Sequence, residues 1–146
     1  MQVERSLEMA AAPQRVWPLL VESQQILKWF TLLKSFEYTS EPPRGVGTTF
    51  HYEEQSGGRL MKLDYRVTEW VENERLAFSV VSGPLRKDDQ VWSIAAVPGG
   101  TKVTLWEDVA LPGGKLGDVV LAPVVGRMIG GHLAEMLVNL KGLAEK

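Results

Sequence analysis

The spacing of apolar and polar residues predicts secondary structure at the start of the chain. Residues 3–9 alternate between the two kinds, as in a short strand. Pro13 then begins a helical segment, because a proline in the first turn of a helix loses no hydrogen bond there. Ser23 is a candidate N-cap for a second short helix. We therefore expect one strand and then two short helices, the first shortened or kinked at Pro18.

From about residue 33 the pattern changes to a period of two. In the clearest segment, residues 60–71, Leu63, Tyr65 and Val67 alternate with charged or polar residues. This alternation is typical of an antiparallel strand with one face in water. Short links rich in glycine and proline separate the segments, which favours hairpins over parallel crossovers. The expected strands are residues 33–40, 48–55, 60–71, 75–82, 89–97 and 101–111.

Helical spacing returns after Gly114 and continues to residue 146. An apolar stripe along this segment consists of Ile129, Leu133, Met136, Leu137 and Leu140. Pro123 and the Gly130-Gly131 pair interrupt the pattern, so a kink or hinge is expected. The sequence thus predicts one α+β domain over residues 1–146, with an antiparallel meander of strands and a long C-terminal helix.

Several short motifs follow one another in a distinctive order. They are Ala12-Pro13 with Val16-Trp17, Leu27 and Trp29, Gly45-x-Gly47-Thr48-x-Phe50, Val67-x-Glu69 before Leu76, Trp92, Gly100-Thr101-x-Val103-Thr104, and Leu140-Lys141 with Glu145. As a set they resemble the helix-grip fold of the START and birch-pollen-allergen-like superfamily (SRPBCC), in its polyketide cyclase/dehydrase-like branch. The resemblance implies a curved sheet of about seven strands wrapped around the C-terminal helix, with a cavity between them. It fixes no reaction, because the superfamily includes lipid carriers, cyclases and co-chaperone-like domains.

The stretch PRGVGTTF, from Pro43 to Phe50, has the Gly-x-Gly spacing of some phosphate-binding loops. Such a loop follows a strand and opens a helix, whose N-terminal amides meet the phosphate. Here the glycines lie between two expected strands, and no lysine or helix follows them. We interpret this stretch as a turn.

Composition narrows the possible functions. The chain has 146 residues, is 45% hydrophobic and carries a formal net charge of −2, so nothing in its charge favours nucleic acid. It has no cysteine, which excludes disulfides and thiolate chemistry. No segment approaches the roughly 18 unbroken apolar residues that suggest a membrane span. We expect a soluble, cytoplasmic protein, and whether it forms a homodimer is left open.

Candidate catalytic residues are few. Glu107 and Asp108 are adjacent on a strand, so one of them faces inward or lies near the end of the strand. Burial would raise the pKa of an inward carboxyl group. Tyr65 is expected to face inward and Arg66 outward, unless the faces of that strand are reversed. His132 lies about 70° from the centre of the apolar stripe, on the helix flank. No metal site or cofactor is expected, since the two histidines are isolated and the sequence contains no cofactor loop.

Aromatic and aliphatic side chains supply the walls of the expected cavity. The candidate ligand-binding residues are Phe50, Tyr52, Leu63, Tyr65, Phe78, Trp92, Trp106, Val120, Val124, Ile129 and Leu133. Residues 56–58, 82–87 and 112–114 are expected at one end of the sheet, where they would form the cavity mouth.

Three hypotheses for function follow. The first is binding of a hydrophobic or aromatic small molecule, lipid-like or polyketide-like, between sheet and helix. The second is a cyclase- or aromatase-like enzyme that uses acid/base residues in that cavity. The third is a protein-interaction module with a filled interior and an exposed apolar patch.

Overall fold

The computed structural model describes the backbone of residues 1–110 and 114–146, and the side chains of residues 1–110 and 119–146. The predicted order of one strand, two short helices, six strands and a long helix is confirmed. Strand β6 begins two residues earlier than expected, which brings Asp88 into the strand. The elements are β1 (Gln2–Met9), α1 (Pro13–Val21), α2 (Ser23–Trp29), β2 (Leu33–Tyr38), β3 (Thr49–Ser56), β4 (Arg59–Val71), β5 (Arg75–Ser82), β6 (Lys87–Val97), β7 (Gly100–Ala110) and α3 (Gly114–Ala144).

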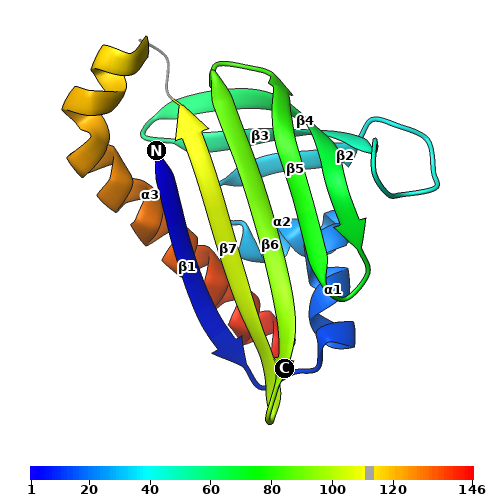
Figure 1. Ribbon diagram of the computed structural model, residues 1–146. Helices are drawn as coiled ribbons and strands as arrows, with labels where there is room; N and C mark the ends of the chain where they lie inside the picture. Colours follow the sequence, from blue (N-terminus) through cyan, green and yellow to red (C-terminus); the bar gives the residue numbers. More distant parts are fainter. Residues whose placement is uncertain (111–113) are drawn as a thin grey trace.

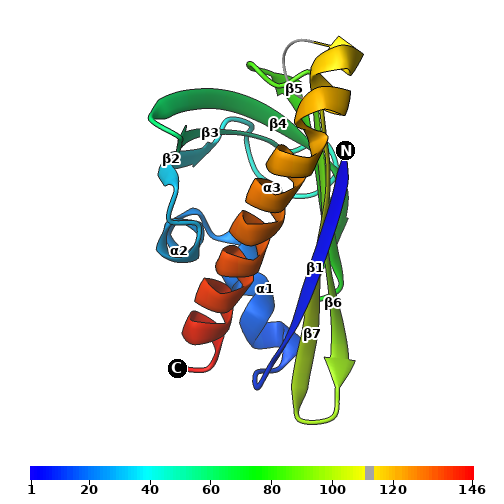
Figure 2. The same cartoon turned by 90° about the vertical axis from the view of Figure 1, so that its left-hand side faces the viewer.

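In the described part of the chain, seven strands form one antiparallel sheet in the order β1-β7-β6-β5-β4-β3-β2. The expected meander from β2 to β7 is confirmed, and β1 joins it beside β7. The register between β4 and β5 shifts at Asp64/Tyr65 and at Val67/Glu69, and such irregularities bend a strand. The sheet curls, and all three labelled helices lie on its concave side (Figures 1 and 2). This is the predicted α+β helix-grip fold.

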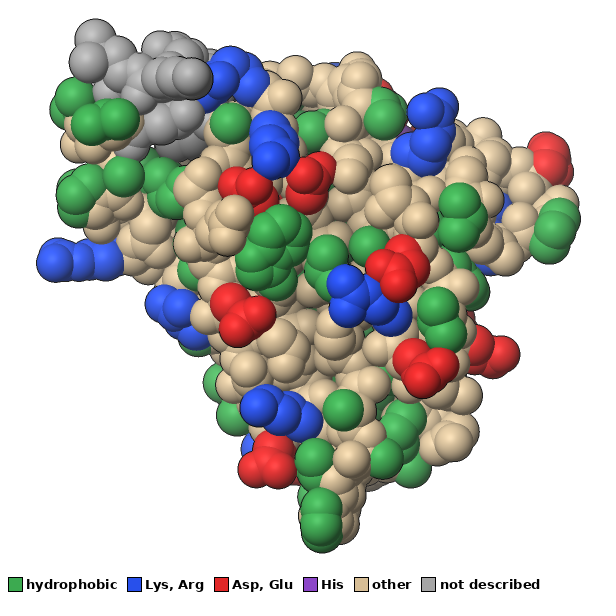
Figure 3. Space-filling model, viewed as in Figure 1, with side chains coloured by type: hydrophobic (Ala, Val, Ile, Leu, Met, Phe, Trp, Pro, Cys, Tyr) green, Lys and Arg blue, Asp and Glu red, His purple; other side chains and the backbone are tan. Residues whose placement is uncertain are grey.

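The alternation predicted for β4 is confirmed. Leu63, Tyr65 and Val67 are buried on the concave side, whereas Lys62 and Arg66 are exposed on the outer side. Acidic and basic side chains are interspersed over the outer face of the sheet (Figure 3). A sheet with one wet face and one packed face therefore directs its apolar side chains toward the helices.

Two tryptophan pairs attach the short helices to the sheet. Trp17 of α1 meets Trp70 of β4 edge to face, with ring centroids 5.5 Å apart. Trp29 of α2 meets Trp92 of β6 at 5.1 Å. The Trp29 indole N–H also donates a hydrogen bond to the Leu19 carbonyl at 2.7 Å, so its polar atom is satisfied. These contacts pack both short helices against the sheet.

The helix boundaries differ from expectation at one residue. Pro13 begins α1 as predicted, and the short helix α1 contains Pro18 and ends at Val21. The predicted capping role of Ser23 is wrong, because Ser23 is the first residue of α2 and Glu22 precedes it without a side-chain cap. Glu22 is extended (φ −85°, ψ 122°) and separates the two helices by itself, which leaves no room for a capping residue after it.

The C-terminal half of α3 fills the concave face of the sheet. The predicted stripe is confirmed at Leu133, Met136, Leu137 and Leu140, which are all buried. The helix is continuous through Pro123 and Gly130-Gly131, and the expected kink or hinge stays a prediction. A Cβ added at Gly130 would lie 2.3 Å from Nη2 of Arg5, so this glycine allows the Arg5 side chain of β1 to approach the helix.

One helix has the length and composition of a membrane span. Residues Val119–Ala144 of α3 contain an 18-residue segment with a mean hydropathy of 1.2. Of this segment, 22% is buried inside the protein. By itself this is a weak indication, since the core helix of a soluble protein meets the same criterion. The expectation that no segment spans a membrane stays a prediction.

The stretch that begins at Pro43 is a turn, as predicted, and its last two residues, Thr49 and Phe50, begin β3. It joins β2 to β3, and no helix follows it. Gly47 has a φ of +92°, which glycine adopts without strain. Its N–H donates a hydrogen bond of 2.9 Å to the Val67 carbonyl, which ties the turn to β4.

A pair of glycine substitutions tests this packing. A Cβ at Gly100 would lie 1.9 Å from the Met9 carbonyl oxygen, whereas a Cβ at Gly131 would meet nothing within 4 Å. We expect Gly100→Ala to lower the free energy of unfolding by about 1–3 kcal/mol, because backbone must move. We expect Gly131→Ala to raise it by up to about 1 kcal/mol, through helix propensity. Urea denaturation of both variants measures this, and an unchanged Gly100→Ala protein contradicts the packing.

Candidate functional site

A cavity of about 240 Å³ lies between the concave face of the sheet and α3. Strands β3, β4, β6 and β7 contribute to its wall, as does the middle of α3. The apolar lining residues are Phe30, Leu32, Met61, Leu63, Leu85, Val109, Val125, Met128, Ile129, Leu133 and Met136. The polar lining residues are Tyr52, Glu54, Ser56, Tyr65, Asp88, Gln90, Glu107 and His132.

A chain of hydrogen bonds crosses the sheet wall of the cavity. The Tyr52 hydroxyl donates to the Tyr65 hydroxyl at 2.8 Å, and the Tyr65 hydroxyl donates to Oδ2 of Asp88. The Gln90 amide donates to the same Asp88 oxygen and to Oε2 of Glu107, each at 3.2 Å. Burial raises the pKa of both tyrosines well above the ordinary value. They therefore remain protonated donors at neutral pH.

Two carboxyl groups in this cavity are poised to hold protons. Burial, with a smaller contribution from the negative charge of Asp88, raises the pKa of Glu54 to about 7. Burial and then the nearby Asp88 raise the pKa of Glu107 well above its ordinary value. A carboxyl group with a pKa near neutrality can both give and accept a proton, which is the property of a general acid or base.

Asp88 has one carboxylate oxygen without a partner. Its side chain is almost fully buried (2% exposed). Among the residues that the structure describes, no hydrogen-bond donor reaches its Oδ1. A buried acceptor without a donor is costly, so native proteins leave few of them.

His132 of α3 lies on the cavity wall beside Phe30, with ring centroids 5.5 Å apart. Burial lowers its pKa below the ordinary value, and Glu135 opposes this only in part. The imidazole is therefore neutral at pH 7 and brings no positive charge to the cavity.

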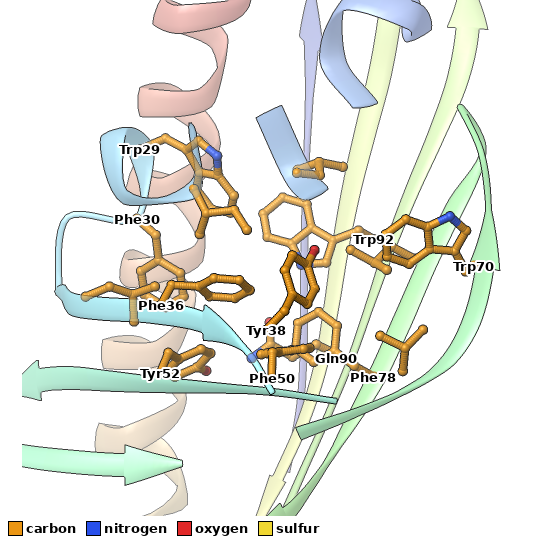
Figure 4. A pocket seen from close by; sticks show the side chains of 15 residues that line it. Trp29, Phe30, Phe36, Tyr38, Phe50, Tyr52, Trp70, Phe78, Gln90 and Trp92 are labelled. Atoms are coloured by element: carbon orange, nitrogen blue, oxygen red, sulfur yellow. The ribbon is translucent and has the colours of Figure 1, made fainter. Parts of the chain in front are cut away.

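A second, smaller pocket of about 40 Å³ lies beneath α2. Aromatic rings from α2 and from the strands converge on it, among them Trp29, Phe50, Phe78 and Trp92 (Figure 4). Tyr38 also lines it and donates a hydrogen bond to the Val21 carbonyl. Phe30, Tyr52 and Gln90 line both pockets, so the two spaces share a wall.

Residues 1–145 match the model of the family described as "Polyketide cyclase / dehydrase and lipid transport". The chain belongs to this family. No curated protein matches the sequence.

Solved structures with the same fold come from several organisms. TTHA0849 from Thermus thermophilus has a TM-score of 0.85 at 19% identity, covering 99% of this chain and 97% of its own. The Zhui aromatase/cyclase from Streptomyces sp. R1128 has a TM-score of 0.82 at 14% identity, with coverages of 99% and 93%. A START superfamily protein from Mycobacterium smegmatis has a TM-score of 0.79 at 18% identity, with coverages of 98% and 96%. These similarities establish the START-like, SRPBCC fold of this family member.

Most of the expected lining residues face one of the two pockets. Five of them line the larger cavity, namely Tyr52, Leu63, Tyr65, Ile129 and Leu133. Phe50, Phe78 and Trp92 line only the smaller aromatic pocket. The predicted facing of the strands was therefore correct at these positions.

The expected placement of three residues is wrong. Trp106 lies on the outer side of β7, because its neighbours Leu105 and Glu107 face the concave side. Val120 and Val124 are 66% and 70% exposed. The next residue, Val125, lines the cavity instead, on the same helix face as Ile129 and Leu133, which follow it at intervals of four residues.

The structure separates the candidate catalytic residues. Glu107, Tyr65 and His132 line the cavity. Asp108 faces the other side, where Lys87 lies 2.7 Å from its Oδ2 and holds its pKa below the ordinary value. Arg66 is exposed on the outer face. The last two are therefore remote from the cavity.

Sequence reasoning missed Glu54, Asp88 and Gln90. Glu54 continues the inward alternation of Phe50 and Tyr52. In the same way, Asp88 and Gln90 precede Trp92 on the buried face of β6. Extending the alternation of each strand to its end would have found them, but polar residues at strand ends ordinarily face water.

The described residues contain no group of His, Cys, Asp or Glu side chains arranged to hold a metal ion. The expected mouth lies in part outside the described residues, which omit Pro112 and Gly113. Two incompletely buried lining residues come from the expected mouth, Ser56 at the end of β3 and Leu85 in the β5–β6 loop. Met128 of α3 also lines the cavity and is exposed. These three residues are the candidate rim of the cavity.

The raised pKa of Glu54 predicts how stability depends on pH. The folded protein holds this proton up to about pH 7, whereas the unfolded chain releases it near the ordinary value of 4.5. Between these values the folded state binds more protons, so stability falls as pH rises, in total by roughly 3 kcal/mol at most. We expect Glu54→Gln to flatten this part of the curve.

Urea denaturation from pH 4 to pH 8 measures the effect. Glu37→Gln is the matched control, because Glu37 is exposed on neighbouring β2. A curve for Glu54→Gln that still falls as steeply as that of the control would show that Glu54 is not buried as described.

Proposed function

We propose that this chain binds a hydrophobic or aromatic small molecule in the cavity between the sheet and α3. The observation that carries the proposal is the cavity itself, whose wall is mostly aliphatic and aromatic with polar groups from a few strands. Burial of apolar ligand surface would supply roughly 25 cal/mol per Å² before the costs of association. Membership of a polyketide cyclase, dehydrase and lipid transport family supports the same class of ligand.

Each group of lining residues has a role in this proposal. Leu63, Ile129 and Leu133 would contact the apolar body of the ligand. Tyr52 and Tyr65 would form the aromatic wall, with their hydroxyls already engaged in the chain that leads to Asp88. The polar end of the ligand would lie near Asp88 and Glu107, which are polar groups of the cavity wall.

A second candidate function is acid/base catalysis on a bound ligand. The observation that favours it is the presence of Glu54 and Glu107 in one cavity, both with raised pKa values. Either could transfer a proton to or from a carbonyl compound, as a cyclase or dehydrase requires. The aromatase/cyclase from Streptomyces shares the fold at 14% identity, so it supports the architecture and leaves the reaction to be tested. The interaction module is less favoured, because it needs a filled interior.

A bulky substitution in the cavity tests the binding proposal. Ile129 lines the cavity, whereas Val138 lies on the same helix and is 60% exposed. We expect Ile129→Trp to weaken binding of the neutral dye N-phenyl-1-naphthylamine by about 10-fold or more, because the indole would occupy the cavity. We expect Val138→Trp to bind the dye as the wild type does. Fluorescence titration gives both values of Kd.

Native mass spectrometry of the purified protein complements the titration. A co-purified lipid or aromatic compound at near-stoichiometric amount supports the proposal and identifies compounds to assay for turnover. An empty wild-type protein that also fails to bind the dye contradicts it. Equal dye binding by the wild type and both variants would place the dye outside the cavity and favour the interaction module.

A further inference from the structure

The larger cavity gathers three acidic side chains. Among the described residues, its lining includes the carboxyl groups of Glu54, Asp88 and Glu107 but no lysine or arginine. Lys87, next to Asp88 in sequence, extends to the opposite face of the sheet and pairs with Asp108. The positive charge nearest in sequence thus lies outside the cavity.

The hydrogen bonds to Asp88 are made to only one of its two carboxylate oxygens. Tyr65 and Gln90 both donate hydrogen bonds to its Oδ2. Its Oδ1, in a side chain that is 2% exposed, receives none from the described residues. Asp88 lines the cavity, and a buried acceptor without a donor is the complement of a ligand that brings one.

We propose that the ligand is an organic amine, with an apolar or aromatic body and an ammonium group that donates a hydrogen bond to Oδ1 of Asp88. This inference rests on the proposed function and specifies the ligand class of the same cavity.

The surroundings favour a cation over a neutral donor. A charge-assisted hydrogen bond from an ammonium group to a carboxylate is stronger than one from a hydroxyl. The rings of Phe30, Tyr52 and Tyr65 line the same space, and aromatic faces attract cations. A carboxylic acid of the same shape would place a second negative charge beside Asp88. The cavity therefore discriminates by charge as well as by shape.

Binding of a cation would also change protonation within the cavity. The titratable groups that line it are Tyr52 and Glu54 on β3, Tyr65 on β4, Asp88 on β6, Glu107 on β7 and His132 on α3. A nearby positive charge favours the ionised form of a carboxyl group. Glu54, with a pKa of about 7, would release a fraction of a proton when an amine binds at pH 7.

Two matched series of probes test the inference on the full chain. One series is 1-naphthylmethylamine, 1-naphthylmethanol and 1-naphthoic acid, and the other is decylamine, decan-1-ol and decanoic acid. Isothermal titration calorimetry at pH 7 gives each Kd. In at least one series, we expect the amine to bind about 10-fold or more tightly than the alcohol, and the acid to bind most weakly. Repeating the amine titration in phosphate and in Tris buffer is expected to reveal proton release that the alcohol does not cause.

Two variants test whether Asp88 is responsible for the preference for the amine. Asp88→Asn is expected to weaken binding of the amine more than binding of the alcohol, and so to remove the preference for the amine. Asp89→Asn is the matched control, since Asp89 neighbours Asp88 but lies near Lys87 at 3.7 Å, away from the cavity. If Asp88→Asn does not fold, the test uses the wild-type series together with Glu107→Gln. We expect Glu107→Gln to lose part of the preference for the amine, but less than Asp88→Asn would.

The outcomes separate this inference from the proposed function. If, in both series, the alcohol or the acid binds at least as tightly as the amine, the amine inference is overturned. The cavity then remains a binding site. Retention of the full amine preference by a folded Asp88→Asn protein also overturns it. If none of the six probes binds and no compound co-purifies, the proposed function fails, and the inference fails with it.

Discussion

The C-terminal half of α3 is anchored by Leu133, Leu137 and Leu140, which belong to one buried cluster with Val3 of β1 and Val103 of β7. This contact fixes the helix against the concave face of the sheet. Toward its N-terminus the helix leaves Val120 and Val124 exposed, and the cavity opens beside Val125 and Ile129. The site therefore depends on a helix that is packed tightly along one half and loosely along the other.

The curl of the sheet supplies the second requirement. Irregular register between β4 and β5 bends the strands, so that inward side chains from β3 through β7 converge. A flat sheet would direct the same side chains along parallel lines and enclose no comparable space. The tryptophan contacts of α1 and α2 close the adjacent part of the concave face and leave only the small aromatic pocket there.

The polar groups of the cavity are arranged at a cost to stability. Burying Glu54 and Glu107 beside Asp88 disfavours their charged forms, and no described basic side chain lines the cavity to offset the charge. Packing alone would be served better by apolar residues at these positions. Such an arrangement is typical of groups that bind or react, because a site must keep unused hydrogen-bonding capacity for its ligand.

Tyr52 and Gln90 join the two pockets. Each lines both the aromatic pocket beneath α2 and the larger cavity. Tyr52 is also the first donor of the chain that passes through Tyr65 to Asp88. Tyr52 therefore connects both pockets to Asp88 through two hydrogen bonds.

The sequence by itself determined the order of elements, the meander and the facing of Leu63, Tyr65 and Val67, because a period of two and a period of 3.6 residues are local properties of the backbone. It also determined that Glu107 and Asp108, as neighbours on a strand, point to opposite faces. Only the tertiary structure decided that Glu54, Asp88 and Glu107 share one cavity while Asp108 pairs with Lys87, and that Val124 is exposed where Val125 is not. These facts depend on the curl of the sheet and on the rotation of α3 about its axis, which arise from contacts between residues far apart in the chain.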